Sequence, residues 1–182
     1  MQGLLNAKAA FKTQLEQQSR FQVTAAHYGL AFVAIKEGKT AEAQAELDAA
    51  NAALHKPAGP NVLTSSGTQG PNSLLAALAL EVLLMPAQKP EVAPLAVKAA
   101  DAARHQFPLS RGIAYQYAEA LIADKQLDQA TVYLRDQVQL YKEEPELYDL
   151  LAKAYSTQGK MALQHIALAE SYVLQGATMA AL

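Results

Sequence analysis

Apolar residues recur along most of the chain at intervals of three and four positions, which is the spacing of amphipathic helices. The stretch from Tyr148 to Tyr155 illustrates the pattern, with large apolar side chains at 148, 151 and 155 and Gly159 shortly after them. Prolines and glycines between such stretches mark where helices begin and end. The pattern predicts about ten helices, at residues 3–18, 22–37, 40–55, 73–85, 90–106, 110–124, 127–141, 146–158, 160–174 and 177–181.

Small residues add a second regularity to these predicted helices. Ala31 and Ala43 have the same separation along the chain as Ala118 and Ala130. Small side chains at such places let two antiparallel helices approach closely, and a residue with positive φ between the helices closes the hairpin. The separation of Ala130 and Gln164 equals the period of the tetratricopeptide repeat (TPR), about 34 residues. The chain therefore resembles an array of stacked helical hairpins.

The sequence predicts an all-α fold, a TPR helical-hairpin superhelix of about four repeats plus capping helices. A single TPR domain is expected over residues 1–182, with an N-terminal capping helix at 1–20, repeats at 22–55, 73–107, 110–142 and 145–175, and the start of a further helix at 177–182. The separation of Ala43 and Ala93 exceeds one repeat, and the excess matches an inserted loop rich in Pro, Gly and Ser at 57–73. Two places in the chain depart from the pattern. Glu81 stands where the second repeat needs a small residue, and Asp124-Lys125 stand where the third needs its turn glycine.

Composition and charge narrow the function classes. Hydrophobic residues make up 51% of the chain and charged residues 18%, so the signature of disorder is absent. A net charge of −2 with no basic block argues against nucleic acid as a partner. The absence of cysteine excludes disulfides, cysteine-zinc sites and thiol catalysis. The longest apolar stretch, residues 74–85, contains Glu81 and is too short for a transmembrane segment.

Two segments carry a more specific resemblance. Residues 146–182 contain the pattern L-L-A-x-A-x-x-x-x-G at 150–159, followed by A-x-A-E-x-Y-x-L-x-G at 167–176. Residues 26–43, AHYGLAFVAIKEGKTAEA, add to the likeness. The chain is similar in these segments to the C-terminal TPR region of BepA-like (YfgC-like) bacterial zinc metallopeptidases.

That resemblance implies a protein–protein interaction module of a periplasmic zinc metallopeptidase that acts in outer-membrane protein assembly and quality control. The implied partners are its own peptidase domain and the outer-membrane assembly machinery. The zinc-binding H-E-x-x-H helix of that family needs two histidines at i and i+4, and none of the four histidines here has such a partner. We therefore expect this chain to be no enzyme and to hold no catalytic, cofactor-binding or metal-binding residue. Zinc is expected in a peptidase domain before Met1.

Alternatives from other classes remain open. The chain could be a free-standing TPR scaffold or adaptor of a cell-envelope, pilus or secretion assembly with no protease attached. Residues 1–20 contain no apolar stretch of the kind that signal peptides carry, so a periplasmic location follows from the resemblance alone. Homodimerisation through the apolar part of the groove is a third alternative.

The concave face of a TPR array is formed by the first helix of each repeat, and the register assigns its residues here. The predicted partner-binding groove consists of Tyr28, Phe32, Ile35, Leu75, Leu78, Val82, Met85, Tyr115, Glu119, Ile122, Asp149 and Lys153. It changes from apolar to polar along the chain. We expect the apolar half to be covered by the first helix, by a protein or peptide partner, or by the peptidase domain. Carboxylate recognition is disfavoured because the expected cationic positions hold Tyr28, Phe32 and Leu78, so capture of an apolar helix or strand fits better.

Overall fold

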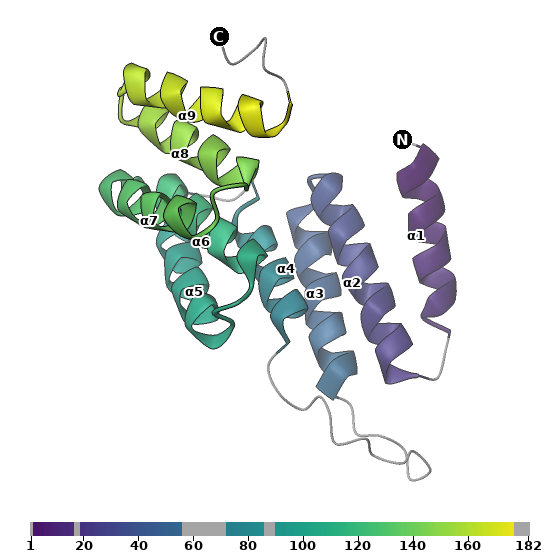
Figure 1. Cartoon of the computed structure of the whole chain (residues 1–182). Helices are drawn as coiled ribbons and strands as arrows, with labels where there is room; N and C mark the ends of the chain where they lie inside the picture. The colour runs from purple at the N-terminus through teal and green to yellow at the C-terminus, as the bar shows by residue number, and fades with distance from the viewer. Residues whose placement is uncertain (1, 17–18, 56–71, 86–89, 177–182) are drawn as a thin grey trace. The chain divides into compact units, whose positions relative to one another are not determined.

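The computed structural model describes residues 2–16, 19–55, 72–85 and 90–176, and this part of the chain is helical, with no strand. The prediction of an all-α protein is thereby confirmed. The helices, labelled in Figure 1, are α1 (Gln2–Gln14), α2 (Arg20–Lys36), α3 (Thr40–His55), α4 (Ser73–Leu83), α5 (Ala93–Gln106), α6 (Arg111–Ala123), α7 (Leu127–Leu140), α8 (Pro145–Thr157) and α9 (Met161–Leu174), with a 3₁₀ turn at Pro90–Val92. The predicted helix at 177–181 and all but the last two residues of the predicted loop at 57–73 lie outside the described residues.

The predicted helix boundaries agree with the observed ones within a few residues. The largest difference is at the end of α1, which was expected to reach residue 18 and ends at Gln14. There the amide of Leu15 donates to the carbonyl of Lys12, a tighter pairing than that of an α-helix. Pro94 stands in the first turn of α5 and Pro145 in that of α8, where the missing amide hydrogen costs no intrahelical hydrogen bond.

The chain divides into two compact units, Met1–Lys89 and Pro90–Leu182. In the first unit α2 and α3 form a hairpin, α1 packs on α2, and α4 packs on both helices of the hairpin. In the second unit each helix from α5 to α9 packs on the next one along the chain. The division falls inside the predicted second repeat, 73–107, so α4 and α5 belong to different units.

One turn geometry closes three of the hairpins. Gly38 lies between α2 and α3 with φ 72°, Lys125 between α6 and α7 with φ 61°, and Gly159 between α8 and α9 with φ 73°. The Gly159 amide donates to the carbonyl of Ser156, and the Lys160 amide donates to that of Tyr155. The other two turns repeat these bonds, which define the Schellman motif. The turn expected at Asp124-Lys125 is thus present, with lysine in the left-handed conformation.

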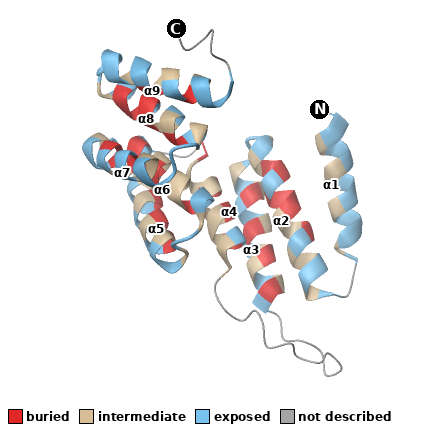
Figure 2. Ribbon diagram, in the orientation of Figure 1, coloured by how far each residue is buried: buried red, intermediate tan, exposed pale blue. Residues whose placement is uncertain are grey.

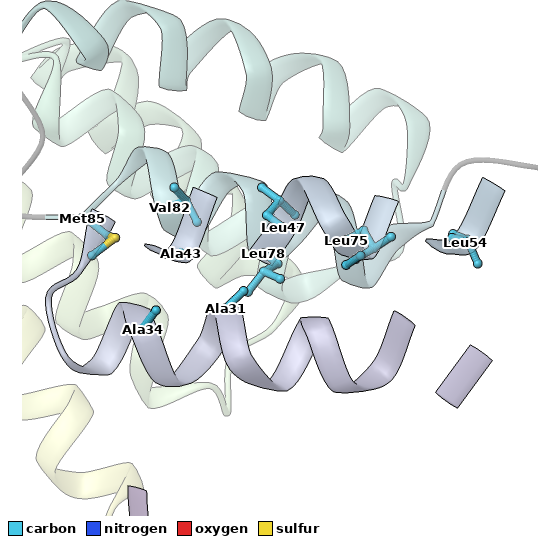
Figure 3. Close-up of a cluster of buried hydrophobic side chains, with 10 residues drawn as sticks. Ala31, Ala34, Ala43, Leu47, Leu54, Leu75, Leu78, Val82 and Met85 are labelled. Atoms are coloured by element: carbon cyan, nitrogen blue, oxygen red, sulfur yellow. The ribbon is translucent and has the colours of Figure 1, made fainter. Parts of the chain in front are cut away.

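Alanines occupy the interior of the first hairpin. Ala31 and Ala34 on α2 and Ala43 and Ala50 on α3 have no exposed surface. They form one apolar cluster with Leu47 and Leu54 of α3 and with four residues of the α4 segment, Leu75, Leu78, Val82 and Met85 (Figure 3). Small residues on the hairpin leave room for the larger side chains of α4, so this cluster joins all three helices.

Leu78 anchors α4 in this core, and its truncation tests the packing. Leu78 is 1% exposed, whereas Leu74 on the same helix is 63% exposed. Leu78→Ala should lower the free energy of unfolding by about 2–5 kcal/mol, because it leaves a cavity among close-packed neighbours. Leu74→Ala is the matched control and should change it by less than about 0.5 kcal/mol. Urea denaturation followed by far-ultraviolet circular dichroism measures both, and similar losses in the two variants would contradict the placement of α4.

The positive-φ turns can be tested from both directions. Lys125→Gly should raise the free energy of unfolding by up to about 1 kcal/mol, since glycine adopts φ 61° without the penalty that a Cβ brings. Gly159→Ala should lower it by about 1–2 kcal/mol for the same reason, because a Cβ added at Gly159 meets nothing within 4 Å and the cost is conformational. Gly112→Ala is the control, because Gly112 lies in helix α6 and a Cβ added there also meets nothing within 4 Å. This substitution should not lower the free energy of unfolding.

Candidate functional site

A hollow of about 280 Å³ opens on the surface of the first unit. Residues of α2, the last turn of α3 and the start of α4 line it. We call it the first-unit hollow, and its members are Phe21, Thr24, Ala25, Tyr28, Leu54, Asn72, Leu74 and Leu75. The α2 members share one side of that helix because 21, 25 and 28 recur at intervals of four and three.

The first-unit hollow has a buried apolar floor and an exposed apolar rim. Leu54 and Leu75 are buried and belong to the core cluster, so the floor is held by the packing of α3 against α4. At the rim Phe21 is 48% and Leu74 is 63% exposed. Large apolar side chains at the rim of an apolar hollow are typical of surfaces that bind another apolar group.

Asn72 positions the α4 side of this hollow. Its side-chain oxygen accepts hydrogen bonds from the backbone amides of Leu74 at 2.9 Å and Leu75 at 3.2 Å. This N-cap satisfies two amides that the helix itself leaves without partners. It therefore determines where α4 starts, and with it the positions of one rim residue and one floor residue.

Two cations of α2 lie against aromatic rings of the same helix. The Arg20 guanidinium is 4.8 Å from the centre of the Phe21 ring. At the other end of the helix Lys36 lies 4.8 Å from the Phe32 ring and forms an ion pair of 3.7 Å with Glu81 of α4. Burial raises the pKa of Tyr28, and the nearby Glu81 carboxylate raises it further, so the phenol is neutral at pH 7. Glu81, which stands where the repeat pattern calls for a small residue, thus pairs with α2.

Four of the predicted groove residues on α2 and α4 lie in or near the first-unit hollow. Tyr28 and Leu75 line it. Phe32, 39% exposed, continues the side of α2 that carries Tyr28, and Ile35 is half-buried against the core.

Leu78, Val82 and Met85 require a correction, because they face the core and not a groove (Figure 3). All three are at most 5% exposed, so no partner can reach them in this structure. The reason is that α4, SLLAALALEVL, is apolar except at Ser73 and Glu81, and spacing alone does not tell its inner face from its outer face. Leu78→Asp would therefore disturb folding and would not test binding.

Two rim residues, Phe21 and Leu74, were missed by the groove prediction. Phe21 lies two turns before Tyr28 on the same side of α2, so continuing the series 32, 28, 25 backwards would have found it. Leu74 precedes the buried Leu75, and no sequence signal separates the two leucines, because their difference in burial arises from tertiary packing.

The predicted residues of the second unit are placed differently. Tyr115 is half-buried and its hydroxyl donates to Glu144 at 3.1 Å, while Arg111 forms an ion pair with the same carboxylate. Burial raises the pKa of Tyr115. Ile122 is 4% exposed and so belongs to the core, which corrects its assignment to a groove. Glu119 is half-buried, and Asp149 and Lys153 are exposed.

The second unit has a hollow of its own, of about 200 Å³, between α7, α8 and α9. Its lining combines apolar side chains with Arg135 and Glu170, and its members are Arg135, Val138, Gln139, Tyr148, Leu151, Tyr155, Leu163, Ile166, Ala167 and Glu170. None of the twelve predicted groove residues is among them. The prediction considered only the first helix of each repeat, whereas most of this hollow comes from the second helices.

The side chains around the first-unit hollow can offer apolar contact and a few hydrogen bonds. In the part of the chain that the structure describes, no three side chains of His, Cys, Asp or Glu come together as a metal site requires. His27 pairs with Glu46 between α2 and α3, with 2.7 Å between Nδ1 and Oε2. None of the described helices has the length and apolar content needed to cross a membrane.

Comparison with known proteins gives no match to a family model and none to a curated protein. The likeness to BepA-like metallopeptidases therefore rests on the residue patterns at 26–43 and 146–182.

Replacing the N-cap at the edge of the first-unit hollow should have a measurable cost. Asn72→Ala leaves the amides of Leu74 and Leu75 without their side-chain acceptor and should lower the free energy of unfolding by about 1 kcal/mol. Asn72→Asp keeps an acceptor at the N-terminus of α4 and should retain most of that stability. Thermal melts of the three proteins make the comparison. Equal melting temperatures for Asn72→Ala and the parent chain would contradict this role.

Proposed function

We propose that this chain is a protein-binding module of the TPR type that holds apolar segments of a partner. The observation that carries the proposal is the first-unit hollow, where Phe21 and Leu74 leave apolar surface exposed above a fixed apolar floor. Partners with aromatic or branched aliphatic side chains match this chemistry.

Local geometry supports the TPR assignment. The Schellman turn recurs at Gly38, Lys125 and Gly159, and the last two are one TPR period apart. The two equally spaced alanine pairs, 31 with 43 and 118 with 130, are fully buried. These are the features by which stacked helical hairpins repeat, since each hairpin needs a tight turn and small residues where its helices cross.

The cations of α2 favour a partner segment that is apolar and carries little charge of its own. Arg20 and Lys36 each lie against an aromatic ring, and Lys36 is also paired with Glu81. These cations are thus already engaged, and recognition falls to the apolar groups. An extended segment with alternating apolar side chains, such as a strand of an unfolded β-barrel protein, fits this requirement.

The wider role that we propose follows from the resemblance. In this role the chain is the TPR domain of a periplasmic BepA-like zinc metallopeptidase. The TPR domain presents substrates or the outer-membrane assembly machinery to a separate zinc domain. The alternative is a free-standing TPR scaffold or adaptor of a cell-envelope, pilus or secretion assembly. The gene's reading frame before Met1 separates the two. A leader and H-E-x-x-H there support the protease, and their absence supports the scaffold.

Binding through the first-unit hollow can be tested with short labelled peptides from the strands of a bacterial outer-membrane β-barrel protein. Leu74→Asp places a charge on the rim and should weaken binding of the best peptide at least about 10-fold, because the carboxylate would have to lose its water. Fluorescence anisotropy measures the affinity. Leu74 is exposed, so the melting temperature should stay near that of the parent chain.

Leu109→Asp is the matched control, since Leu109 is 91% exposed and belongs to neither hollow. Its affinity should equal that of the parent chain. Equal weakening by both substitutions would show that general surface hydrophobicity, and not the hollow, holds the peptide. If the parent chain binds none of the peptides, the proposed partner class is wrong.

A further inference from the structure

Helix α1 lies on α2 while burying none of its own residues. All thirteen of its residues are exposed or half-buried, and Figure 2 shows the helix in pale blue and tan. Within the first unit it packs on α2 and has a charged contact with α3. An isolated helix of this length is marginal in water, so α1 depends on the surface that it occupies.

Phe11 makes an apolar contact between the two helices, and it meets a glycine. A Cβ added at Gly29 would lie 2.5 Å from the Phe11 ring, closer than real Cβ atoms approach. The ring thus occupies space that only glycine leaves open on α2. Gly29 itself is buried, and so are Ala26 and Val33, which lie on the same side of α2.

A charged contact lies one turn away from this ring. Lys8 Nζ is 2.5 Å from Glu42 Oε1 of α3 and 3.5 Å from Glu37 Oε2 at the end of α2. Lys39 also contacts both carboxylates. The hydrogen bond from Lys8 lowers the pKa of Glu42, and the hydrogen bond from Lys39 lowers that of Glu37, so both groups are anionic at pH 7. The surface under α1 therefore fits a helix that carries a cation and, three residues later, an aromatic ring, as Lys8 and Phe11 do on α1.

We infer that the surface of α2 and α3 under α1 is a binding site for a helix of another protein that carries a lysine three residues before an aromatic residue. Such a helix reproduces both contacts, and α1 is the resident occupant that it displaces. Exchange is feasible because α1 contributes no buried side chain, so an incoming helix has to replace only the Phe11 contact and the partly buried ion pairs of Lys8. This site lies on a different side of α2 from the first-unit hollow and does not rest on the proposed function.

The test uses the full chain with its resident helix weakened by Lys8→Glu and Phe11→Ala. The probe is a fluorescein-labelled peptide with the sequence of residues 2–14, QGLLNAKAAFKTQ. It should bind this double variant at least about 10-fold more tightly than the parent chain, where α1 competes. Peptides with the equivalent Lys→Glu or Phe→Ala change should lose binding. Leu74→Asp, which tests the hollow, should leave binding of this peptide unchanged.

Gly29→Val in the double variant is the specific control, because its side chain fills the space of the Phe11 ring and should abolish binding. Gly112→Val, where an added Cβ meets nothing, should leave binding unchanged. No peptide binding, or binding insensitive to Gly29→Val, overturns the proposal. Unfolding of the first unit in the double variant would show that α1 is an integral part of the fold and would overturn it equally. A dimer of the parent chain that Phe11→Ala abolishes would assign the site to α1 of a second copy instead of a partner protein.

Discussion

The close approach of α2 and α3 over their alanines is the constraint on which the first unit depends. Ala31, Ala34, Ala43 and Ala50 have no exposed surface, and Gly38 closes the hairpin with φ 72°. Larger side chains at these positions would separate the helices, since protein interiors have few voids to absorb added volume. Because the hairpin is narrow, the side chains of α4 reach both of its helices at once, and the floor of the first-unit hollow is part of the same cluster.

Helix α4 therefore contributes both to the stability of the first unit and to the proposed binding surface. Leu75 belongs to the core cluster and also lines the hollow, while Leu74, its neighbour, is exposed at the rim. The Asn72 side chain holds the amides of both leucines. A substitution that loosens the core must consequently alter the hollow as well, whereas a substitution at the rim can alter binding alone. This asymmetry is why an exposed leucine reports on recognition and a buried one reports on folding.

Local features of the sequence predicted the helices and turns well, because the determinants of those elements are local. Proline, glycine and apolar spacing act within one or two turns of helix, and even Lys125 was placed correctly as a turn residue without glycine. The groove was predicted less well. Helix α4 is apolar except at Ser73 and Glu81, so its inner face is decided by the shape of the α2–α3 hairpin and not by its own pattern. The contact of Lys8 with Glu42 joins two helices far apart in the sequence, and no spacing within one helix signals it.

Helix α2 packs on α1 and on α3 and still lines the first-unit hollow, because each of these uses a different side of the helix. Successive residues turn by about 100° around a helix. Ala31 and Ala34 therefore point into the cluster shared with α3 and α4, and Gly29 points toward α1. Tyr28 and Phe32 lie on the remaining side, where the hollow opens. A rotation of α2 that moved Gly29 away from α1 would also withdraw the alanines from α3, and the buried hairpin resists this. Replacement of α1 by another helix can thus leave the orientation of α2 unchanged. We therefore expect the first-unit hollow beside Tyr28 to bind its partner whether α1 or another helix covers Gly29.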